Sequence, residues 1–265
     1  MRYPIRRPLL VACLAIASVA FPAKTHFTKY QESVPAAKTD GPVANVIPLP
    51  SPAPSPAISA TNASHELYHD LQLESNGMEP QVFDMALKGF AKLSEAGKIA
   101  NTEKLTIIDF SQPSNQKRLY VIDLDKKQVL FQSLVAHGRG TGTLWATSFS
   151  NQPSSYKSSP GFYVTQETYR GHNGYSLRLD GLEKGINDNA RSRSIVMHGA
   201  PYASEASIRS LGFLGRSEGC PALPLPLNKK IINTIKNGTC LFIYTRDSSY
   251  LNESEWLNGS QATTF

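Results

Sequence analysis

The chain has 265 residues, with 27 Lys and Arg residues against 21 Asp and Glu residues, and a formal net charge of +6. No aromatic–basic motif accompanies this moderate charge, so we expect no nucleic-acid partner and attribute the charge first to solubility. A basic surface would also suit an anionic polymer. Roughly two hundred residues follow the N-terminal segments described next, which is enough for one hydrophobic core and predicts one folded domain.

The first 23 residues have the pattern of a secretory signal peptide. Three arginines within residues 2–8 precede an apolar run from Leu9 to Ala20, which is too short to span a bilayer comfortably. Small residues close the run, so we expect cleavage after Ala20 or Ala23. The pattern predicts export to the periplasm or cell envelope, with no stable membrane insertion after cleavage. An uncleaved membrane anchor is the alternative.

Residues 24–62 are rich in Pro, Ala and Ser and lack apolar periodicity. Repeated prolines favour an extended chain that cannot form a core, so we predict a linker. Residues 63–104 are predicted to form a helical lead-in that packs on the domain after it. Apolar residues recur at helical spacing from Pro80 to Ala96, and residues 63–74 are a weaker helix candidate.

Residues 105–250 are predicted to form the main folded domain, because short β-rich segments separated by turn residues begin at Leu105. The predicted strands are Leu105–Phe110, Leu119–Leu124, Gln128–Phe131, Gly161–Thr165, Tyr175–Leu179, Ser194–His198 and Cys240–Thr245. We expect a short helix at Leu227–Lys236 and a C-terminal tail at 251–265. Many short strands with few helices predict a mainly β fold, a β-sandwich with a short helical N-terminal region and a helix near the C-terminus.

The most informative motif is the run GRSEGCPAL at residues 215–223. Gly219 permits backbone angles that a side chain forbids, and Pro221 fixes φ after Cys220, which predicts a tight turn. A thiolate in such a turn, with a histidine as base and turn amides to receive the oxyanion, suits nucleophilic acyl transfer. His198 lies upstream and is the candidate base. A structural cysteine in a plain turn is the alternative.

A second alternative for Cys220 is a disulfide with Cys240. Exported proteins tend to pair their cysteines or avoid them, so a bridge between these two would make the motif structural. Cys240 opens the apolar stretch Cys240–Tyr244, which is typical of a buried strand. We therefore predict a core thiol at Cys240 and a free thiol at Cys220.

From about Leu105 to Tyr244 the chain resembles the murein L,D-transpeptidase catalytic domain, the YkuD-like family, in the variant whose motif reads GRSxGCPA. Besides that motif, the matching segments are 108–111 with 118–123, Val135–Gly138, Ser159–Tyr163 and Ile195–Ala200. The resemblance implies a YkuD-like β-sandwich, a cysteine nucleophile and a peptidoglycan stem peptide as substrate. It implies neither a metal nor another cofactor.

The resemblance also implies a mechanism. Cys220 attacks the carbonyl of the third stem residue, D-alanine leaves, and an amine of a second stem resolves the thioester into a 3→3 cross-link. His198 transfers the proton and is oriented by the main-chain carbonyl of Gly199. The turn amides of Gly219 and Cys220 form the oxyanion hole, and Ser217 is a hydrogen-bonding residue of the turn.

Several residues are candidates for substrate binding. Many family members have a polar residue two positions after the cysteine, where this chain has Ala222, so Arg216 or Arg139 would take its place. His137 stands at a strand end and could line the cleft, although a capping or core role is equally compatible. Tyr163 could contact substrate, and packing is the alternative.

Two patterns bear on cofactors. The glycine-rich loop Gly138–Gly142 lacks the Gly-Lys-Ser/Thr ending of a phosphate loop, which argues against a nucleotide. His65 and His69 are four residues apart and could place two imidazoles on one helix face, but no further ligand cluster completes a metal site. We expect no cofactor, and both histidines as exposed helix residues.

Three functional alternatives stay open at this point. Water in place of the amine would make the protein an L,D-carboxypeptidase, and a cysteine amidase acting on protein would use the same Cys220 and His198. The third is an inactive cell-wall binding protein. Glu218 next to the thiol is its main argument, because a nearby carboxylate raises the pKa of a thiol.

Overall fold

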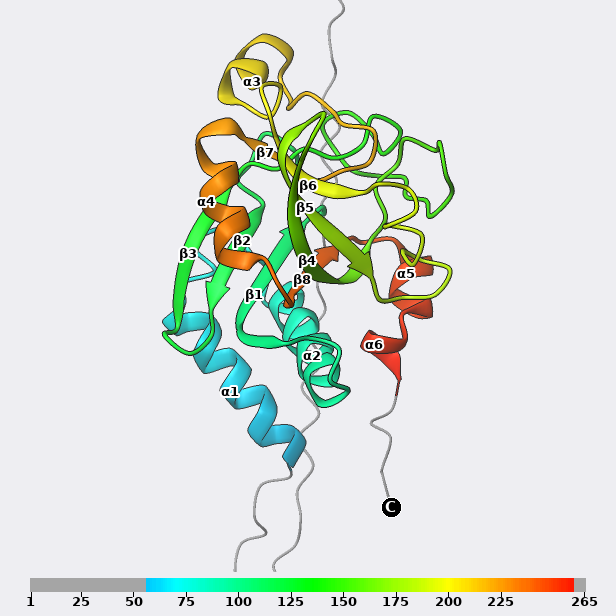
Figure 1. The fold of residues 1–265 in the computed structure, drawn as a ribbon. Helices are drawn as coiled ribbons and strands as arrows, with labels where there is room; N and C mark the ends of the chain where they lie inside the picture. The colour runs from blue at the N-terminus through cyan, green and yellow to red at the C-terminus, as the bar shows by residue number, and fades with distance from the viewer. Residues whose placement is uncertain (1–55, 260–265) are drawn as a thin grey trace, which may run out of the picture. The chain divides into compact units, whose positions relative to one another are not determined.

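The computed structural model describes residues 56–259 (Figure 1). The predicted signal peptide and the predicted linker up to residue 55 lie outside these residues. Helix α1 (Pro56–Asp70) begins inside the range predicted as linker, so this helix starts earlier than the sequence suggested. Proline is compatible with a first helical turn and alanine favours a helix, which accounts for the early start at Pro56-Ala57. No helix within 56–259 is long and apolar enough to cross a bilayer.

Eight strands form one sheet in the order β3-β2-β1-β8-β4-β5-β6-β7. Their bounds are β1 (Asn101–Asp109), β2 (Leu119–Asp123), β3 (Gln128–Ser133), β4 (Gly161–Gly171), β5 (Gly174–Gly181), β6 (Val196–Ala200), β7 (Ala222–Pro224) and β8 (Thr239–Tyr244). The pairs β1–β8 and β6–β7 are parallel, and the other neighbours are antiparallel. Every predicted strand has a counterpart, while β7 directly after the cysteine motif was not predicted.

The two edges of this sheet are joined. Just beyond edge strand β3, Ala136 bridges to Ala222 of the opposite edge strand β7. Gly138 forms a second bridge, with Ser217. The sheet therefore curls back on itself, which satisfies edge groups that would otherwise stay open. This arrangement agrees with the mainly β, sandwich-like fold that the sequence predicts, and it brings the cysteine motif next to the segment after β3.

Alternate side chains of the central strands enter two separate cores, as the period of two in a strand requires. The first core takes Leu105 and Ile107 of β1 and Cys240 and Phe242 of β8, and helices cover it. The second core takes Ile108, Leu241 and Ile243 from the opposite face, together with Leu177 and Met197. Because both faces are covered, these strands are apolar almost throughout.

Helices α2 (Pro80–Glu95) and α4 (Leu225–Ile235) cover opposite faces of the sheet. The contact of α2 with β4 is close at Gly89, where a Cβ atom would lie 2.0 Å from the Phe162 ring. A larger residue at this position would force the helix off the sheet. Both helices match predicted helices to within a few residues.

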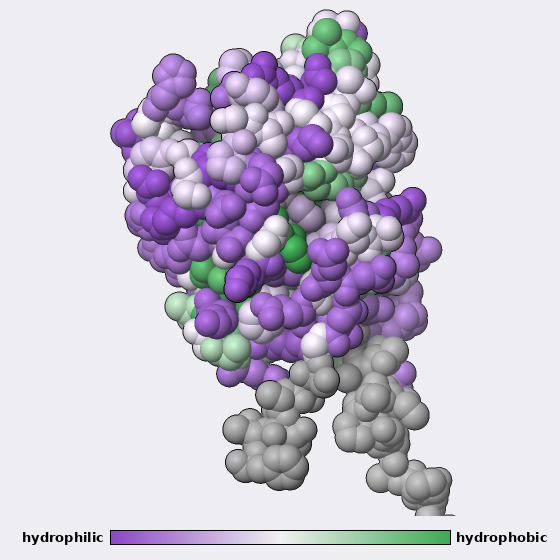
Figure 2. All heavy atoms as spheres, turned by 90° about the vertical axis from the view of Figure 1, so that its right-hand side faces the viewer, coloured by the Kyte–Doolittle hydropathy of each residue, from purple (hydrophilic) through white to green (hydrophobic). Residues whose placement is uncertain are grey.

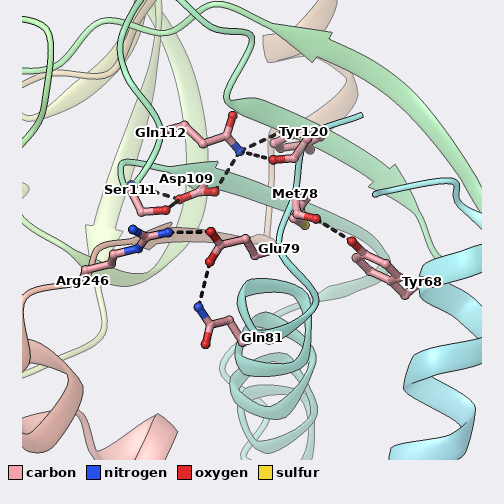
Figure 3. Close-up of polar contacts among 10 residues, drawn as sticks. Tyr68, Met78, Glu79, Gln81, Asp109, Ser111, Gln112, Tyr120 and Arg246 are labelled. Atoms are coloured by element: carbon pink, nitrogen blue, oxygen red, sulfur yellow. Dashed lines mark hydrogen bonds and ion pairs between the residues drawn. The ribbon is translucent and has the colours of Figure 1, made fainter. Parts of the chain in front are cut away.

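The lead-in is fixed to the sheet by a polar network (Figure 3). At the end of β1, Asp109 accepts hydrogen bonds from Ser111 and from Gln112 Nε2 at 2.8 Å. The same Gln112 nitrogen donates to Gly77 O and contacts the Tyr120 hydroxyl, while Arg246 after β8 pairs with Glu79. These contacts join the helical lead-in to the ends of β1 and β8.

Three short helices were not predicted. Helix α3 (Glu205–Leu211) lies above β6 and β7 in Figure 1. Helices α5 (Ser248–Glu253) and α6 (Glu255–Asn258) fall in the range assigned to the end of the domain and its tail. Leu257, within the range expected as a tail, is buried in the first core together with Tyr250 of the domain, so this part of the chain packs on the domain. Figure 2 views the molecule from the right-hand side of Figure 1 and shows a mostly hydrophilic face with small separate apolar groups.

Candidate active site

The cysteine motif forms a turn that hydrogen bonds hold rigidly. Ser217 Oγ donates to the Cys220 carbonyl at 2.7 Å and accepts from the Gly219 amide at 3.1 Å. Gly219 has φ +127°, and a Cβ atom there would lie 2.8 Å from the Lys157 carbonyl oxygen. Glycine is therefore required at this position both by backbone angle and by space. The prediction of Ser217 as a hydrogen-bonding residue of the turn agrees with these contacts.

The thiol of Cys220 is buried but not isolated, with 9% of the residue exposed. Its Sγ atom accepts from the Val196 amide at 3.4 Å and donates to the Ser194 carbonyl at 3.6 Å. Burial raises the pKa of Cys220, and Glu218 adds to the rise, while the Val196 amide and Arg193 oppose it. The thiol is therefore neutral near pH 7, and a base must remove its proton before it can act as a nucleophile.

His198 stands on β6 beside the motif. Its Cα partner on β7 is Ala222, two residues after Cys220. The Nδ1–H donates to the Gly199 carbonyl at 3.1 Å, which leaves Nε2 as the atom that can accept a proton. Burial lowers the pKa of His198, so the ring is neutral near pH 7. The predicted contact with Gly199 is present.

Among the hydrogen bonds of residues 56–259, none joins Cys220 to His198, although both side chains line the same cavity. Hydrogen bonds between a nucleophile and its base are often longer without substrate and tighten when it binds.

The structure changes the expectation for the oxyanion hole. The Gly219 amide is engaged by Ser217 Oγ, so in this state it is not free to receive an oxyanion. Among the described residues, no hydrogen bond acceptor is found for the Cys220 amide. Of the two predicted donors, Cys220 N–H is therefore the available one. The sequence alone does not show that Ser217 Oγ occupies the Gly219 amide, because this contact depends on the conformation of the turn.

The turn opens into a cavity of about 810 Å³. The residues around it are Arg139, Ser154, Tyr156, His172, Asn173, Arg193, Ser194, Ile195, His198, Tyr202, Arg216, Ser217, Glu218 and Cys220. Three arginines and one glutamate give the cavity a positive balance, which suits a ligand that carries carboxylates. The predicted residues Arg139 and Arg216 are both at this cavity.

The two predicted arginines are held differently. Arg139 forms a 3.4 Å ion pair with Glu218, and its guanidinium stacks 3.8 Å from the centre of the Tyr156 ring. Arg216 donates to the Gly142 carbonyl at 3.2 Å, its guanidinium lies 5.5 Å from the centre of the Phe213 ring, and the residue is exposed. Glu218 thus has a cationic partner that offsets part of its effect on the thiol.

His137 and Tyr163, also predicted at the cleft, do not line this cavity. His137 is 1% exposed; its Nδ1 accepts from buried Arg118 at 2.8 Å and its Nε2 donates to Gly142 O at 3.2 Å. Tyr163 is fully buried, and its hydroxyl donates to Ser159 O at 2.9 Å. The structure thus favours the alternatives to substrate contact: a core role for His137, and packing for Tyr163, which alternation along β4 directs into the second core.

His137 nevertheless supports the turn from behind. Its carbonyl accepts the Ser217 amide at 3.0 Å, and the Arg139 amide donates to Ser217 O at 2.7 Å. Burial and the neighbouring Arg118 lower the pKa of His137 to about 3, so the ring stays neutral. A neutral ring can accept from Arg118 on one side and donate to Gly142 on the other.

Several cavity residues were not predicted at the site. His172 and Asn173 at the β4–β5 hairpin tip are exposed and border the cavity. Tyr202 and Arg193 carry no motif signal, because the loops that contain them are positioned only by the fold. Burial, Cys220 and Glu218 raise the pKa of Tyr202 to about 12.

The two cysteines cannot pair in this fold. Cys220 and Cys240 are both free and belong to separate cores on opposite faces of the sheet. His65 and His69 lie on an exposed helix face with their Nε2 atoms 3.2 Å apart. Within residues 56–259, no group of three or more His, Cys, Asp or Glu side chains could hold a metal ion.

The sequence matches a family profile described as the L,D-transpeptidase catalytic domain over residues 74–244. Among solved structures it is similar to an L,D-transpeptidase from Mycobacterium smegmatis, with 13% identity, 54% of this chain and 59% of that chain covered, and a TM-score of 0.34. An L,D-transpeptidase from Stackebrandtia nassauensis shows 15% identity, coverages of 70% and 78%, and a TM-score of 0.32.

L,D-transpeptidase 3 from Mycobacterium tuberculosis shows 14% identity, coverages of 54% and 61%, and a TM-score of 0.32. The chain thus spans 59% and 61% of the lengths of the two mycobacterial structures. Comparison with curated proteins gives no match.

Proposed function

Because the chain belongs to the L,D-transpeptidase catalytic-domain family, we propose that it is a cysteine-dependent L,D-transpeptidase acting on peptidoglycan stem peptides. The observation that carries this proposal is that Cys220 and His198 line the same cavity. The thiol stands on a rigid turn, and the imidazole stands on a strand paired in register with the residues after that turn. A nucleophile and a base that open onto one cavity suit acyl transfer.

In the first half-reaction, Cys220 Sγ gives its proton to His198 Nε2 and attacks the carbonyl of the third stem residue. The oxyanion that forms accepts a hydrogen bond from the Cys220 amide. The bond to D-alanine then breaks, and the departing amine takes the proton back from His198. The Nδ1–H contact with the Gly199 carbonyl supports this role, because it keeps Nε2 free for both transfers.

In the second half-reaction, an amine from another stem peptide attacks the thioester and passes its proton to His198. A new amide forms, the Cys220 sulfur is released, and the product is a 3→3 cross-link. Water in place of the amine would release the tripeptide, which is the L,D-carboxypeptidase alternative. Both outcomes use the same acyl-enzyme.

The positive cavity supports a stem peptide as ligand. Such a peptide carries carboxylates, among them the terminal carboxylate of D-alanine. Guanidinium groups bind carboxylates with two parallel hydrogen bonds, and Arg216 presents its guanidinium to solvent at the cavity rim. Arg139 is the second candidate, although it first has to leave Glu218.

One observation favours an inactive binding protein as the second candidate. Burial and Glu218 raise the pKa of the Cys220 thiol, and no hydrogen bond to His198 is found among the described residues to offset this. A binding protein would retain the stem peptide in the cavity without forming a thioester.

We also propose that the protein works in the cell envelope, where peptidoglycan is located. The support is the signal-like sequence of residues 1–23, with its arginines followed by a short apolar run. Sequencing the amino terminus of protein taken from its native compartment tests this, and a start near Phe21 or Lys24 is expected.

Intact-mass measurement after incubation with a stem tetrapeptide, and separately with a carbapenem, tests the proposed activity. We expect an adduct of the tripeptide acyl group, an adduct of the carbapenem, and neither of these in Cys220→Ala. Peptide retention without any adduct would identify a binding protein. A protein that ignores both reagents would contradict the proposal and favour an amidase acting on other substrates.

A further inference from the structure

Arg193 is the cavity residue with the most hydrogen bonds to its surroundings. Its Nη1 donates to the Ser150 carbonyl at 2.8 Å and to Ser159 Oγ at 2.6 Å. Its Nη2 donates to the Lys157 carbonyl at 2.7 Å and to Ser155 Oγ at 3.2 Å. All four acceptors are neutral. Among the ion pairs of residues 56–259, none includes Arg193.

The other two cavity arginines differ from it. Arg139 forms a 3.4 Å ion pair with Glu218, and both Arg139 and Arg216 are exposed residues whose charge water screens. Arg193 is only partly exposed, and burial lowers its pKa, as expected for a cation that water and carboxylates do not fully compensate. Its positive charge therefore acts on the neighbouring protein groups with less screening by water than the charges of Arg139 and Arg216.

The backbone directly after Arg193 contacts the sulfur of Cys220. The next residue, Ser194, accepts the thiol hydrogen through its carbonyl, and the Val196 amide donates to Sγ. Ser194 has φ +56°, which turns the chain before β6 begins and explains why this strand starts two residues later than predicted. The turn allows both the guanidinium and the thiol to border one cavity.

The segment that Arg193 holds also contacts the cysteine turn. Ser158, between two of the residues bound by Arg193, donates through Oγ to the Gly219 carbonyl at 2.9 Å. The same oxygen accepts the Gly138 amide at 3.0 Å. Arg193 is thus joined to the turn by two routes, through the 150–159 segment and through its own neighbours Ser194 and Val196.

We propose that the uncompensated guanidinium of Arg193 stabilises the thiolate of Cys220, in addition to holding the 150–159 segment against the cysteine turn. This inference rests on the proposed use of Cys220 as a nucleophile. Once the proton has moved to His198 Nε2, the sulfur carries a negative charge on a residue that is only 9% exposed, where a nearby cation has a larger effect than in water.

The other charged and titratable groups around the sulfur do not replace this contribution. Glu218 acts in the opposite direction, and Tyr202 stays protonated because its pKa is raised to about 12. His198 is neutral until it accepts the thiol proton. Arg139 offsets Glu218, and Arg216 is exposed at the rim.

The pH dependence of Cys220 alkylation by iodoacetamide tests the inference without any peptide substrate. The full chain is labelled from pH 6 to pH 10.5, and peptide mapping locates the label. In Arg193→Gln we expect the midpoint of the alkylation rate to rise by about one pH unit, which is roughly a tenfold lower rate below the midpoint. Arg193→Lys keeps the charge but loses the forked hydrogen bonds, so its midpoint should stay near that of the unchanged protein.

Two controls separate charge from structure. Arg191→Gln removes an arginine two positions earlier that pairs with Asp180 and Glu167 on the surface, and its midpoint should not change. Ser159→Ala removes one acceptor of Arg193 and leaves the charge in place, so its midpoint should also be unchanged. If Arg193→Gln does not fold, Arg193→Met replaces it, because methionine fills a similar space without charge.

Equal shifts in Arg193→Gln and Arg193→Lys would overturn the inference, because the hydrogen bonds rather than the charge would then matter. An unshifted midpoint in Arg193→Gln would overturn it as well. The proposed activity can fail independently of this inference. A shifted alkylation midpoint together with no adduct from tetrapeptide or carbapenem would support the role of Arg193 and contradict the proposed transpeptidase activity.

Discussion

Two cysteines of this chain lie on opposite faces of one sheet, and their surroundings favour different roles for their thiols. Cys240 stands in β8 between β1 and β4, is 0% exposed, and packs in the first core. Burial alone shifts its pKa, strongly upward, with neither hydrogen bond nor charge to oppose it. Cys220 stands just before an edge strand, where an amide, an arginine and a cavity surround its sulfur. Position in the sheet, rather than residue type, separates a core thiol from a candidate nucleophile.

Replacement of each cysteine by alanine gives the largest expected effect. Cys220→Ala should abolish release of D-alanine from a stem tetrapeptide, because the nucleophile and its base act as a unit. Cys240→Ala should retain the activity and lose about 1 kcal/mol of unfolding free energy, because it only removes a sulfur from a packed core. D-alanine release and urea denaturation measure the two quantities.

Circular dichroism of both variants provides the control that the fold is retained. The comparison of the two cysteines breaks down if Cys220→Ala still releases D-alanine, or if Cys240→Ala is as inactive as Cys220→Ala.

Removal of the base gives the next largest effect. His198→Ala should lower kcat/KM by at least ~10²-fold near neutral pH, the range for a positioned acid–base group. Because burial lowers the pKa of His198 below 6.5, the rising limb of the pH profile should lie below pH 6.5 in the unchanged protein. Initial rates of D-alanine release across pH 4.5 to 9 measure both effects.

His172→Ala is the matched control, because this histidine borders the same cavity but lies on the hairpin tip. Its rate should change far less than that of His198→Ala. An equal loss in the two variants would show that the wrong imidazole has been assigned as the base.

Sequence patterns predicted those parts of the molecule whose chemistry is local. Short β-rich segments indicated the strands, and Gly219 and Pro221 indicated a turn around Cys220, where Gly219 indeed has a left-handed φ. The contact between Arg118 and His137 could not be predicted, because it depends on the register of the β2–β3 hairpin, in which Leu119 pairs with Ser133, and on the path of the chain after β3. Likewise, Arg193 lies in a loop whose place at the cavity depends on Ser194 and on the 150–159 segment.

The side of the sheet that carries Cys220 also holds a buried imidazole, which predicts a stability effect of pH. The pKa of His137 falls from its ordinary 6.5 to about 3 on folding. Below pH 6.5 the unfolded chain binds a proton that the folded protein does not bind, so acid favours unfolding. At pH 5 this amounts to roughly 2 kcal/mol relative to pH 7.5.

His137→Gln removes this proton-binding difference, because glutamine can accept from Arg118 and donate to Gly142 without titrating. The unfolding free energy of this variant should therefore fall less between pH 7.5 and pH 5, by roughly 2 kcal/mol, than that of the unchanged protein. Urea denaturation at the two pH values measures the difference. Parallel losses in both proteins would mean that His137 accepts a proton in the folded state.

The smallest effect concerns the turn that distinguishes Cys220 from Cys240. Ser217→Ala removes the hydrogen bonds that link Ser217 Oγ to the Cys220 carbonyl and the Gly219 amide. Two consequences oppose each other: the turn loses about 1 kcal/mol of support, and the Gly219 amide becomes a second donor for the oxyanion. Because the loss of rigidity affects the position of the sulfur directly, we expect a net decrease in kcat of about tenfold or less with KM nearly unchanged. Steady-state kinetics on the tetrapeptide decide the sign, and a kcat that rises would show that the serine restrains the oxyanion hole more than it supports the nucleophile.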